Sequence, residues 1–204
     1  VLEIISHIDD FKPDIIHCND WQTALVPLYY NSFYANRPGY EGIRTVYTIH
    51  NIQYQGVYGT ELLNEVIGVS PSDYSLLDYD GLVNFSKSAI ECCNKVTTVS
   101  PSYANEILDP WYSHGLDGIL LKNSWKLTGI LNGIDVDSYN PQTDKALPYK
   151  YSAARKTGKA KCKEALEERF GFEHKPDVPI MSLISRLVSH KGLDLITNMI
   201  DELL

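Results

Sequence analysis

The sequence of 204 residues has no long hydrophobic run. No apolar stretch approaches the ~18–20 residues that span a bilayer, so no membrane helix is expected. The first residues, VLEIISHIDD, include no initiator Met and no basic segment before an apolar one, which excludes a recognisable signal peptide. They are typical of a helix that is already under way. We therefore expect the chain to be a piece of a longer protein.

Cysteine is also scarce, with four residues: Cys18, Cys92, Cys93 and Cys162. None of them forms a C-x-x-C pair, which argues against a zinc or dithiol redox site and favours reduced thiols. Asp135 and Asp137 have no third ligand beside them, so turn or cap roles fit them better than a metal site. No metal and no cofactor are expected.

Positive charge is in short supply. The sequence has 18 Lys and Arg residues and 26 Asp and Glu residues, which gives a formal net charge of −8. Such a chain is a poor general binder of nucleic acid or of an anionic membrane, and neither is expected as a partner. An anionic substrate would need a locally basic pocket. The hydrophobic share of 44% is ordinary for a globular domain.

Short runs rich in Val, Ile and Thr recur along the chain and predict buried strands. They lie at residues 13–20, 44–51, 95–102, 126–135 and 178–186. Helical patterns lie between them, at 21–34, 82–93, 100–108 and 154–171, and a Pro-containing polar stretch at 140–152 reads as a linker. Strands buried on both faces and separated by helices predict an α/β fold with a parallel sheet.

Polar residues follow the predicted strands. In an open parallel α/β sheet, ligands bind at the carboxyl ends of the strands. The residues at these ends are His17, Asn19, Asp20, His50, Asn51, Ser100, Pro101, Asn132, Gly133, Asp135, Ser185 and Arg186. If the strands share one direction, these groups line one edge of the sheet.

Each of these residues also has a structural interpretation. His17 lies inside an apolar run and fits a hydrogen-bonded core histidine. Asp20 precedes Trp21 and fits either a helix cap or a functional carboxylate. His50 precedes the polar, aromatic segment NIQYQGVYG, which is typical of a sugar-binding loop. Turn chemistry alone would account for Asn132 and Gly133.

Arg186 and Lys191 place two cations after the last predicted strand. A cation there costs desolvation energy unless an anion meets it. Arginine offers a rigid fork for phosphate and lysine a mobile charge. Gly192 permits close backbone approach, and a helix from Leu193 would add its positive end. Salt bridges to carboxylates elsewhere are the alternative.

Five segments taken together resemble the bacterial glycogen synthase and plant starch synthase family. In order, they are PDIIHCNDWQTALVP, TVYTIHNIQYQGVYG, KVTTVSPSYANEI, GLDGILLKNSWKLTGILNGIDVDSYNP and ISRLVSHKGLDLI, and they cover nearly the whole chain. The resemblance implies a retaining glycosyltransferase of the GT-B type, with two Rossmann-like domains. It further implies ADP-glucose as the donor and the non-reducing end of an α-1,4-glucan as the acceptor.

The resemblance also implies roles for individual residues. Arg186 and Lys191 would neutralise the donor diphosphate, and His50 would contact the donor glucose near the reaction centre. Asp20 matches an aspartate at the sugar end of the site. These four are the predicted catalytic residues. The family usually has a further histidine within the stretch that reads HCND here, a departure that leaves Asp20 and Trp21 in place.

Further substrate contacts are implied on two loops. Asn132 and Gly133, in LNGID, match a turn that faces the same site. Tyr54 and Gln55 match the loop after the histidine and would touch the donor or the acceptor glucan.

The implied domain organisation has three parts. Residues 1–140 would belong to an N-terminal, acceptor-side domain, 141–177 would form a linker and connecting helix, and 178–204 the first strand and helix of a C-terminal, donor-side domain. The family's Lys-x-Gly-Gly loop, its carboxyl-domain glutamate and its Gly-rich donor loop are not found in this sequence. We therefore expect the chain by itself not to transfer glucose.

Two alternatives stay open. One is a UDP-glucose-dependent enzyme of the same fold, similar to sucrose synthase, and the other is a glucan-binding module without activity. A glycosidase is disfavoured because no pair of carboxylates is placed as acid and nucleophile. The family resemblance implies a cytoplasmic location in a bacterium and a plastid in a plant or alga.

Overall fold

The computed structural model describes residues 1–203, and the last residue of the third predicted part, Leu204, lies outside them. The chain divides into two units, Val1–Gly133 and Ile134 to the end, called unit 1 and unit 2 here. The division falls a few residues before the predicted boundary at residue 140.

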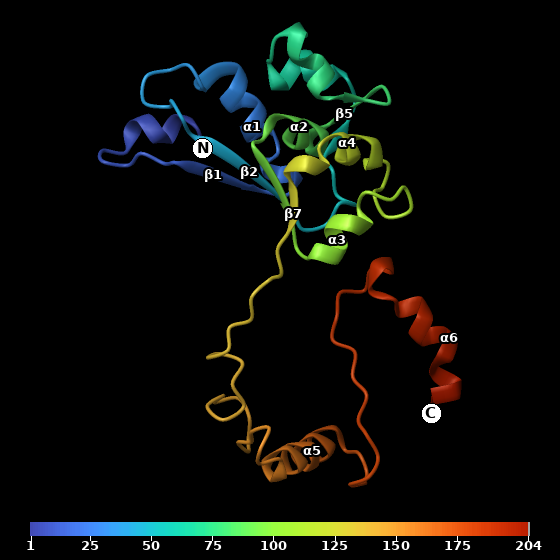
Figure 1. The fold of residues 1–204 in the computed structure, drawn as a ribbon. Helices are drawn as coiled ribbons and strands as arrows, with labels where there is room; N and C mark the ends of the chain where they lie inside the picture. Colours follow the sequence, from blue (N-terminus) through green and yellow to red (C-terminus); the bar gives the residue numbers. More distant parts are fainter. Residues whose placement is uncertain (204) are drawn as a thin grey trace. The chain divides into compact units, whose positions relative to one another are not determined.

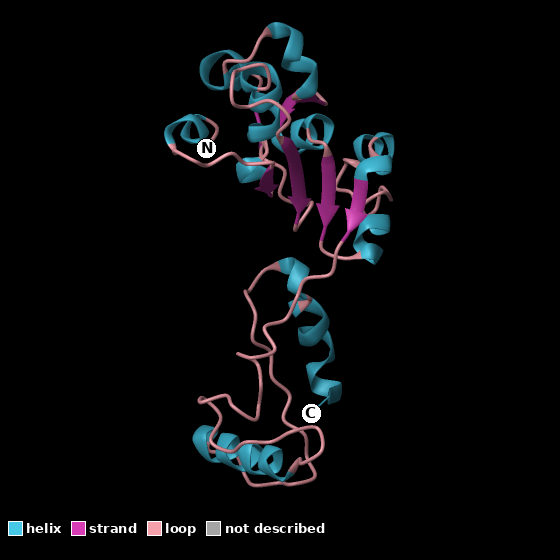
Figure 2. Ribbon diagram, turned by 60° about the vertical axis from the view of Figure 1, so that its left-hand side comes forward, coloured by secondary structure: helices cyan, strands magenta, loops and turns pink. Residues whose placement is uncertain are grey.

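Unit 1 is built on a parallel sheet whose strands follow the chain order, β1-β2-β6-β7 (Figures 1 and 2). Its strands are β1 (Ile15–Asn19), β2 (Arg44–Ile49), β6 (Lys95–Thr98) and β7 (Leu127–Gly129). The predicted α/β fold with a parallel sheet is therefore confirmed. Four of the five predicted strands form, and β7 is much shorter than the run of apolar residues suggested.

Several helices and helical turns surround this sheet. They are η1 (Glu3–His7), η2 (Trp21–Thr23), α1 (Leu25–Tyr29), η3 (Tyr30–Tyr34), α2 (Phe85–Cys92), α3 (Pro101–Glu106), α4 (Asp117–Lys122) and η6 (Ser124–Lys126). Local chemistry explains where two of them start: the Asn84 side chain accepts from Lys87 N–H at α2, and Ser100 Oγ accepts from Tyr103 N–H at 2.9 Å at α3.

Alternate residues of the strands form the core. Ile16, Cys18, Tyr47, Ile49 and Val96 are buried together with residues of the helices, among them α2 and α4, that run along the sheet (Figure 1). The opposite face of β1 is exposed, since its burial alternates along the strand. The expectation that every strand is buried on both faces was therefore wrong for β1.

A second, antiparallel sheet in unit 1 was not predicted. Its order is β3-β5-β4, formed by β3 (Val57–Tyr58), β4 (Asp78–Tyr79) and β5 (Leu82–Asn84). Two helical turns, η4 (Leu63–Ile67) and η5 (Pro71–Leu76), accompany it. A separate apolar cluster containing Leu28, Leu77 and Val83 is buried here.

Unit 2 contains α5 (Thr157–Phe170), the 3₁₀ turn η7 (Ser189–Lys191) and α6 (Leu193–Leu203). The predicted helix at 154–171 is confirmed, and residues 140–152 form turns and irregular structure, as a linker would. The strand predicted at residues 178–186, at the start of the third part, is wrong, because these residues form no strand. No strand occurs in the described part of unit 2, and an isolated strand cannot form its hydrogen bonds.

Across residues 1–203, the structure holds no helix that combines the length and apolarity needed to cross a bilayer.

Candidate functional site

The carboxyl ends of β1 and β2 bring together Asn19, Asp20 and His50. Asp20 Oδ1 accepts a hydrogen bond from the backbone N–H of His50 at 2.8 Å. The His50 ring nitrogen Nε2 lies 3.0 Å from Asn19 Oδ1. Because the strands are parallel and adjacent, residues 31 positions apart in the chain meet at one edge. The predicted proximity of Asp20 and His50 is therefore what the structure shows.

Asp20 has an unusual backbone conformation, with φ 55° and ψ 178°. Its N–H donates to Thr48 O at 2.9 Å, and its carboxylate accepts from the His50 N–H, so Asp20 is bonded to two residues at the end of β2. A non-glycine residue in such a region is strained by about 1–3 kcal/mol and persists only where its surroundings impose it. The Asp20 side chain makes no cap bond to the turn that follows, and only its backbone carbonyl accepts from the Thr23 N–H, at 3.1 Å. A side-chain helix cap therefore does not describe its contacts.

A line of polar side chains crosses the sheet next to this edge. His17 Nε2 lies 2.6 Å from Thr48 Oγ1, which lies 2.6 Å from Thr97 Oγ1. The three residues belong to three neighbouring strands, β1, β2 and β6. His17 is exposed on the open side of β1, so the core-histidine interpretation was wrong. The two threonines were missed, because nothing local in the sequence separates them from ordinary strand residues.

The loop after His50 is fixed at its start by α3. The backbone N–H of Ile52 donates to Tyr103 Oη at 3.2 Å. Burial raises the pKa of Tyr103, so its hydroxyl stays neutral at physiological pH. Tyr103 was not among the predicted residues, and its spacing gives no signal for this contact.

Gln55 is buried in the structure, with 9% exposed. Its Nε2 donates to Ile52 O at 3.1 Å and to His114 O at 3.0 Å, and its Oε1 accepts from Asn84 Nδ2 at 2.7 Å. Both ends of the amide are thus occupied by protein groups. The predicted sugar contact of Gln55 is not supported by this geometry, in which the side chain braces the loop instead. Its neighbour Tyr54 is 46% exposed and remains accessible to a ligand.

Gly56 lies in the loop after His50, at the point where the loop backbone packs against the ring of Trp21. Its φ is +66°, and a Cβ atom there would lie 2.7 Å from Cε3 of Trp21. Both facts require glycine. Trp21 also contacts Tyr58, with ring centroids 6.2 Å apart. The tryptophan that follows Asp20 is therefore a support for the loop that carries Tyr54.

Asn132 and Gly133 lie at the end of unit 1 in an irregular, exposed segment. The expectation of a glycine-dependent turn was wrong, since Gly133 has no positive φ. The turn begins later: Asp135 Oδ1 accepts from the N–H groups of Asp137 and Ser138 at 3.1 and 2.9 Å. The bonds from the backbone and the side chain of Ser138, and then the bond from Asp137, lower the pKa of Asp135. They confirm its predicted turn role.

Arg186 and Lys191 lie in unit 2, and both are exposed. Lys191 ends the turn η7, and Gly192 follows with φ +69° before α6 begins at Leu193. The predicted helix start after the second cation is therefore present. Gly192 supplies the left-handed turn that links η7 to α6, which is a role in the backbone path.

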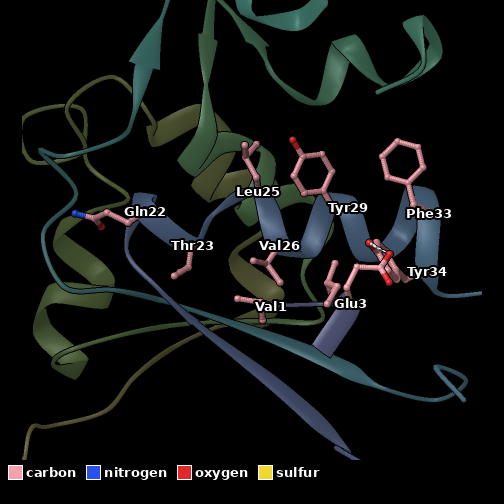
Figure 3. Close-up of a pocket in the computed structure, with 10 residues that line it drawn as sticks. Val1, Glu3, Gln22, Thr23, Leu25, Val26, Tyr29, Phe33 and Tyr34 are labelled. Atoms are coloured by element: carbon pink, nitrogen blue, oxygen red, sulfur yellow. Dashed lines mark hydrogen bonds between the residues drawn. The ribbon is translucent and has the colours of Figure 1, made fainter. Parts of the chain in front are cut away.

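A hollow of about 520 Å³ lies between η1 and the α1–η3 helix, and Gln22 and Thr23, which follow the end of β1, are among the residues that line it (Figure 3). Apolar side chains of Val1, Val26 and Phe33 line much of it. Its carboxylate, Glu3, already accepts from Tyr34 Oη at 2.7 Å and pairs with Arg37 at 3.2 Å. With few convergent polar groups left over, this hollow is a weaker candidate than the strand edge. The described residues contain no His, Cys, Asp and Glu group arranged to hold a metal.

Comparison with known proteins gives a consistent result. A family model described as the starch synthase catalytic domain matches residues 1–122. Curated glycogen synthases of Desulforamulus reducens and Clostridioides difficile are each 44% identical over 206 residues, and that of Clostridium acetobutylicum is 43% identical over 207. Each alignment covers 100% of this chain and 43% of the relative, so the chain spans less than half the length of these relatives.

A solved structure is similar as well. The catalytic domain of starch synthase IV from Arabidopsis thaliana, bound to ADP and acarbose, matches with a TM-score of 0.88 and 38% identity. The match covers 98% of this chain and 42% of that one. The family model covers more than half of the chain, and the sheet edge that carries Asp20 and His50 lies within it. The chain therefore belongs to the starch synthase catalytic domain family.

Proposed function

We propose that the parent protein transfers glucose from ADP-glucose to the non-reducing end of an α-1,4-glucan, with retention at the anomeric carbon. The observation that carries the proposal is the edge formed by Asn19, Asp20 and His50 in a chain of this family. There a histidine is fixed through both its backbone and its ring. Such fixed polar groups at the carboxyl edge of a parallel sheet are typical of ligand sites in α/β proteins.

The donor assignment depends on relatives. The starch synthase IV structure contains ADP and acarbose, an adenine nucleotide and an oligosaccharide-like ligand. We extend both kinds of ligand to the parent of this chain as substrates. UDP-glucose is the competing donor, and glucan binding without transfer is the competing function.

In the proposed reaction, the bond between glucose and diphosphate breaks and negative charge grows on the leaving phosphate. Arg186 and Lys191 neutralise that charge, which stabilises the transition state more than the ground state. His50 contacts the donor glucose. The side chains of Arg186 and Lys191 are exposed in unit 2, so both cations are accessible to an anion.

Retention by two displacements would need a free carboxylate nucleophile. Asp20 is the carboxylate at the described sheet edge, and its Oδ1 already accepts from the His50 N–H. We assign this carboxylate to positioning and propose a front-face route, in which the acceptor hydroxyl attacks on the side from which the diphosphate leaves. Asp20 then acts by holding His50 in position.

The test is transfer of radiolabelled glucose to glycogen by the full-length parent, with ADP-glucose and UDP-glucose compared at equal concentration. We expect ADP-glucose to be used faster. Equal or faster use of UDP-glucose overturns the donor, and binding of glucan with no transfer from either donor favours the binding module.

The same assay tests the two cations. Loss of one preorganised charge contact costs about 3 kcal/mol, so Arg186→Ala and Lys191→Ala should each lower kcat/KM about a hundredfold. Lys145→Ala, which removes a lysine from the irregular 140–152 segment, is the matched control. Near-normal kcat/KM in either cation variant contradicts the diphosphate role.

Two further parts of the proposal concern the setting. We expect the 204-residue chain by itself to show no transfer, because near-attack geometry needs every contact to donor and acceptor. The parent would work in the cytoplasm of a bacterium or the plastid of a plant or alga. Asn132, Gly133 and Tyr54 stay predicted substrate contacts.

A further inference from the structure

Two aromatic side chains, Trp111 and Tyr112, stand out from the surface of unit 1. They are 84% and 49% exposed, and they belong to a loop at residues 109–116 that we call the aromatic loop. Large aromatic rings are expensive to leave in water, and most proteins bury them. Single exposed rings are common on protein surfaces, so the held backbone and the position of this loop are what set these two apart.

Hydrogen bonds hold the backbone of the aromatic loop. Asp109 Oδ1 accepts from the Trp111 N–H at 2.8 Å, and Asp109 O accepts from the N–H groups of Tyr112 and Ser113 at 3.0 Å each. Ser113 is fully buried, and its Oγ donates to Asp117 Oδ1 at 2.9 Å. The backbone that carries both rings is thus held by hydrogen bonds within the loop.

The aromatic loop also contains a strained residue. His114 has φ +50°, which a bulky non-glycine side chain rarely adopts. Its carbonyl accepts from Gln55 Nε2 at 3.0 Å, and the next carbonyl, that of Gly115, accepts from Tyr79 Oη. Strained residues held by surrounding contacts gather at ligand sites.

Gln55 joins the aromatic loop to the loop that follows His50. Its amide bonds Ile52 O on one side and His114 O on the other. Tyr54, which is 46% exposed, lies next to Gln55 in sequence. Three exposed aromatic rings are therefore carried by two loops that share one buried side chain, beside the edge that holds His50.

We propose that Trp111 and Tyr112 form a binding surface for the α-1,4-glucan acceptor, with sugar rings stacked on the aromatic faces. This inference rests on the proposed function and adds a ligand surface to it. A glucan is uncharged, and each sugar presents a C–H face that suits an aromatic ring and hydroxyls that suit nearby polar groups. A linear chain of several sugars has the length to extend from the reaction centre across a neighbouring loop.

The chain offers a matched control in Trp125. This residue is also exposed, at 76%, but it lies in η6, directly before β7 begins. Since the strands are parallel, Trp125 marks the amino end of the sheet, whereas the aromatic loop is tied to the carboxyl end. Neither tryptophan belongs to the core. Trp125 does contact Lys126, whose Nζ lies 5.6 Å from the ring centroid, so the melting temperature of the control variant is measured as well.

The experiment measures glucan binding and kinetics of the full-length parent carrying Trp111→Ala, Trp111→Phe or Trp125→Ala. Maltoheptaose and glycogen are the ligands. Affinity electrophoresis measures glucan binding, and steady-state kinetics at saturating ADP-glucose give the acceptor KM. Trp111→Ala should weaken binding and raise the acceptor KM about tenfold, the size of a moderate interface contact, with kcat changed less than about twofold. Trp111→Phe should recover most of the affinity, and Trp125→Ala should match the parent.

The outcomes separate this inference from the proposed function. Normal glucan affinity in Trp111→Ala, in a parent that still synthesises glucan, overturns the binding surface and leaves the proposed function standing. An equal loss in Trp125→Ala also overturns it, because general surface stickiness would then explain the binding. A parent that neither binds glucan nor transfers glucose overturns both. Thermal melting confirms that each variant is folded.

Discussion

Units 1 and 2 differ in what holds them together. The buried hydrophobic residues of the described chain all lie in unit 1, the last of them being Leu120. In unit 2, the helix α5 buries only Gly158 and Glu167, while apolar side chains such as Phe170, Phe172 and Ile184 are exposed. Unit 1 is stabilised by apolar burial, and the most buried side chain of unit 2 is an ion-paired carboxylate.

This difference also separates the predicted site residues of the two units. The edge with Asp20 and His50 is built on a packed sheet, so it is preformed and its geometry depends on unit 1's core. Arg186 and Lys191 lie on an exposed segment with little apolar support. The positions of the groups at the edge in unit 1 are therefore fixed by a packed core, whereas those of the two cations in unit 2 are not.

The largest expected effect compares two leucines in helices. Leu120 in α4 is 1% exposed and Leu166 in α5 is 39% exposed. Leu120→Ala should lower the free energy of unfolding by about 2–5 kcal/mol, because it opens a cavity in the core. Leu166→Ala should change it by less than about 1 kcal/mol. Urea denaturation of the two variants measures both, and equal losses would mean that α5 is better packed than its exposure indicates.

The second prediction separates position from charge at the sheet edge. In the full-length parent, Asp20→Ala should lower kcat about a hundredfold, since a displacement of about 1 Å at a reacting group costs that much. Asp20→Asn keeps an oxygen that can accept from the His50 N–H, so it should retain most of the activity. Steady-state kinetics distinguish the two. If Asp20→Asn is as poor as Asp20→Ala, the negative charge itself is required.

The third prediction uses the ionic contacts of unit 2. Glu167 is bonded by Lys163 Nζ at 2.6 Å and His174 Nδ1 at 2.7 Å, and these bonds lower its pKa from 4.5 to about 2. A carboxylate with a depressed folded pKa stabilises the fold above pH 4.5 and loses that contribution as the pH falls toward 2. The 172–175 segment should therefore loosen over that range, while unit 1 loses nothing through this group.

Amide hydrogen exchange at residues 172–175, followed from pH 5 to pH 3, measures this loosening. Glu167→Gln serves as the comparison, because it removes the titrating group and should show weaker protection that no longer changes with pH. Unchanged protection of the parent segment across the range would show that the cluster adds nothing to the fold.

The smallest effect concerns thiol reactivity. Cys18 and Cys93 are 2% and 4% exposed, and burial raises the pKa of Cys18 to about 11 and that of Cys92 to about 12. Iodoacetamide at pH 8 should therefore modify Cys162 of unit 2 first, because that thiol is half-buried and the thiolate is the reactive form. Peptide mass mapping over time gives the order. Early labelling of Cys18 would indicate that unit 1 opens locally.

Much of unit 1 could be predicted because its signals are local. Runs of Val, Ile and Thr marked β1, β2 and β6, and Ser100 with Pro101 marked the start of α3. The small sheet was missed, since strands of two or three residues are too short to show a period. The run at 178–184 looked like a strand, but a strand also needs a neighbour, which no local pattern reveals.

The candidate site was predicted in part for the same reason. His50 and Asp20 follow strands, so their meeting at one edge followed from parallel topology alone. The contacts that define their roles join residues far apart in sequence: 30 positions separate Asp20 from His50, and 59 separate Gln55 from His114. Whether Gln55 points to a sugar or braces a loop depends on a partner that only the fold brings near.

The order of the large sheet bears on how the chain assembles during synthesis. Each strand of β1-β2-β6-β7 pairs with the strand made just before it among these four, so the sheet can grow at one edge as the chain leaves the ribosome. No finished strand has to move aside for a later one. The longest interval between two successive strands is the synthesis of the chain from Ile49 to Lys95. At about 5–20 residues per second, this synthesis takes about 2–9 s. During that interval β2 presents an unpaired edge, and the segment that makes the small antiparallel sheet is the part of the chain being made.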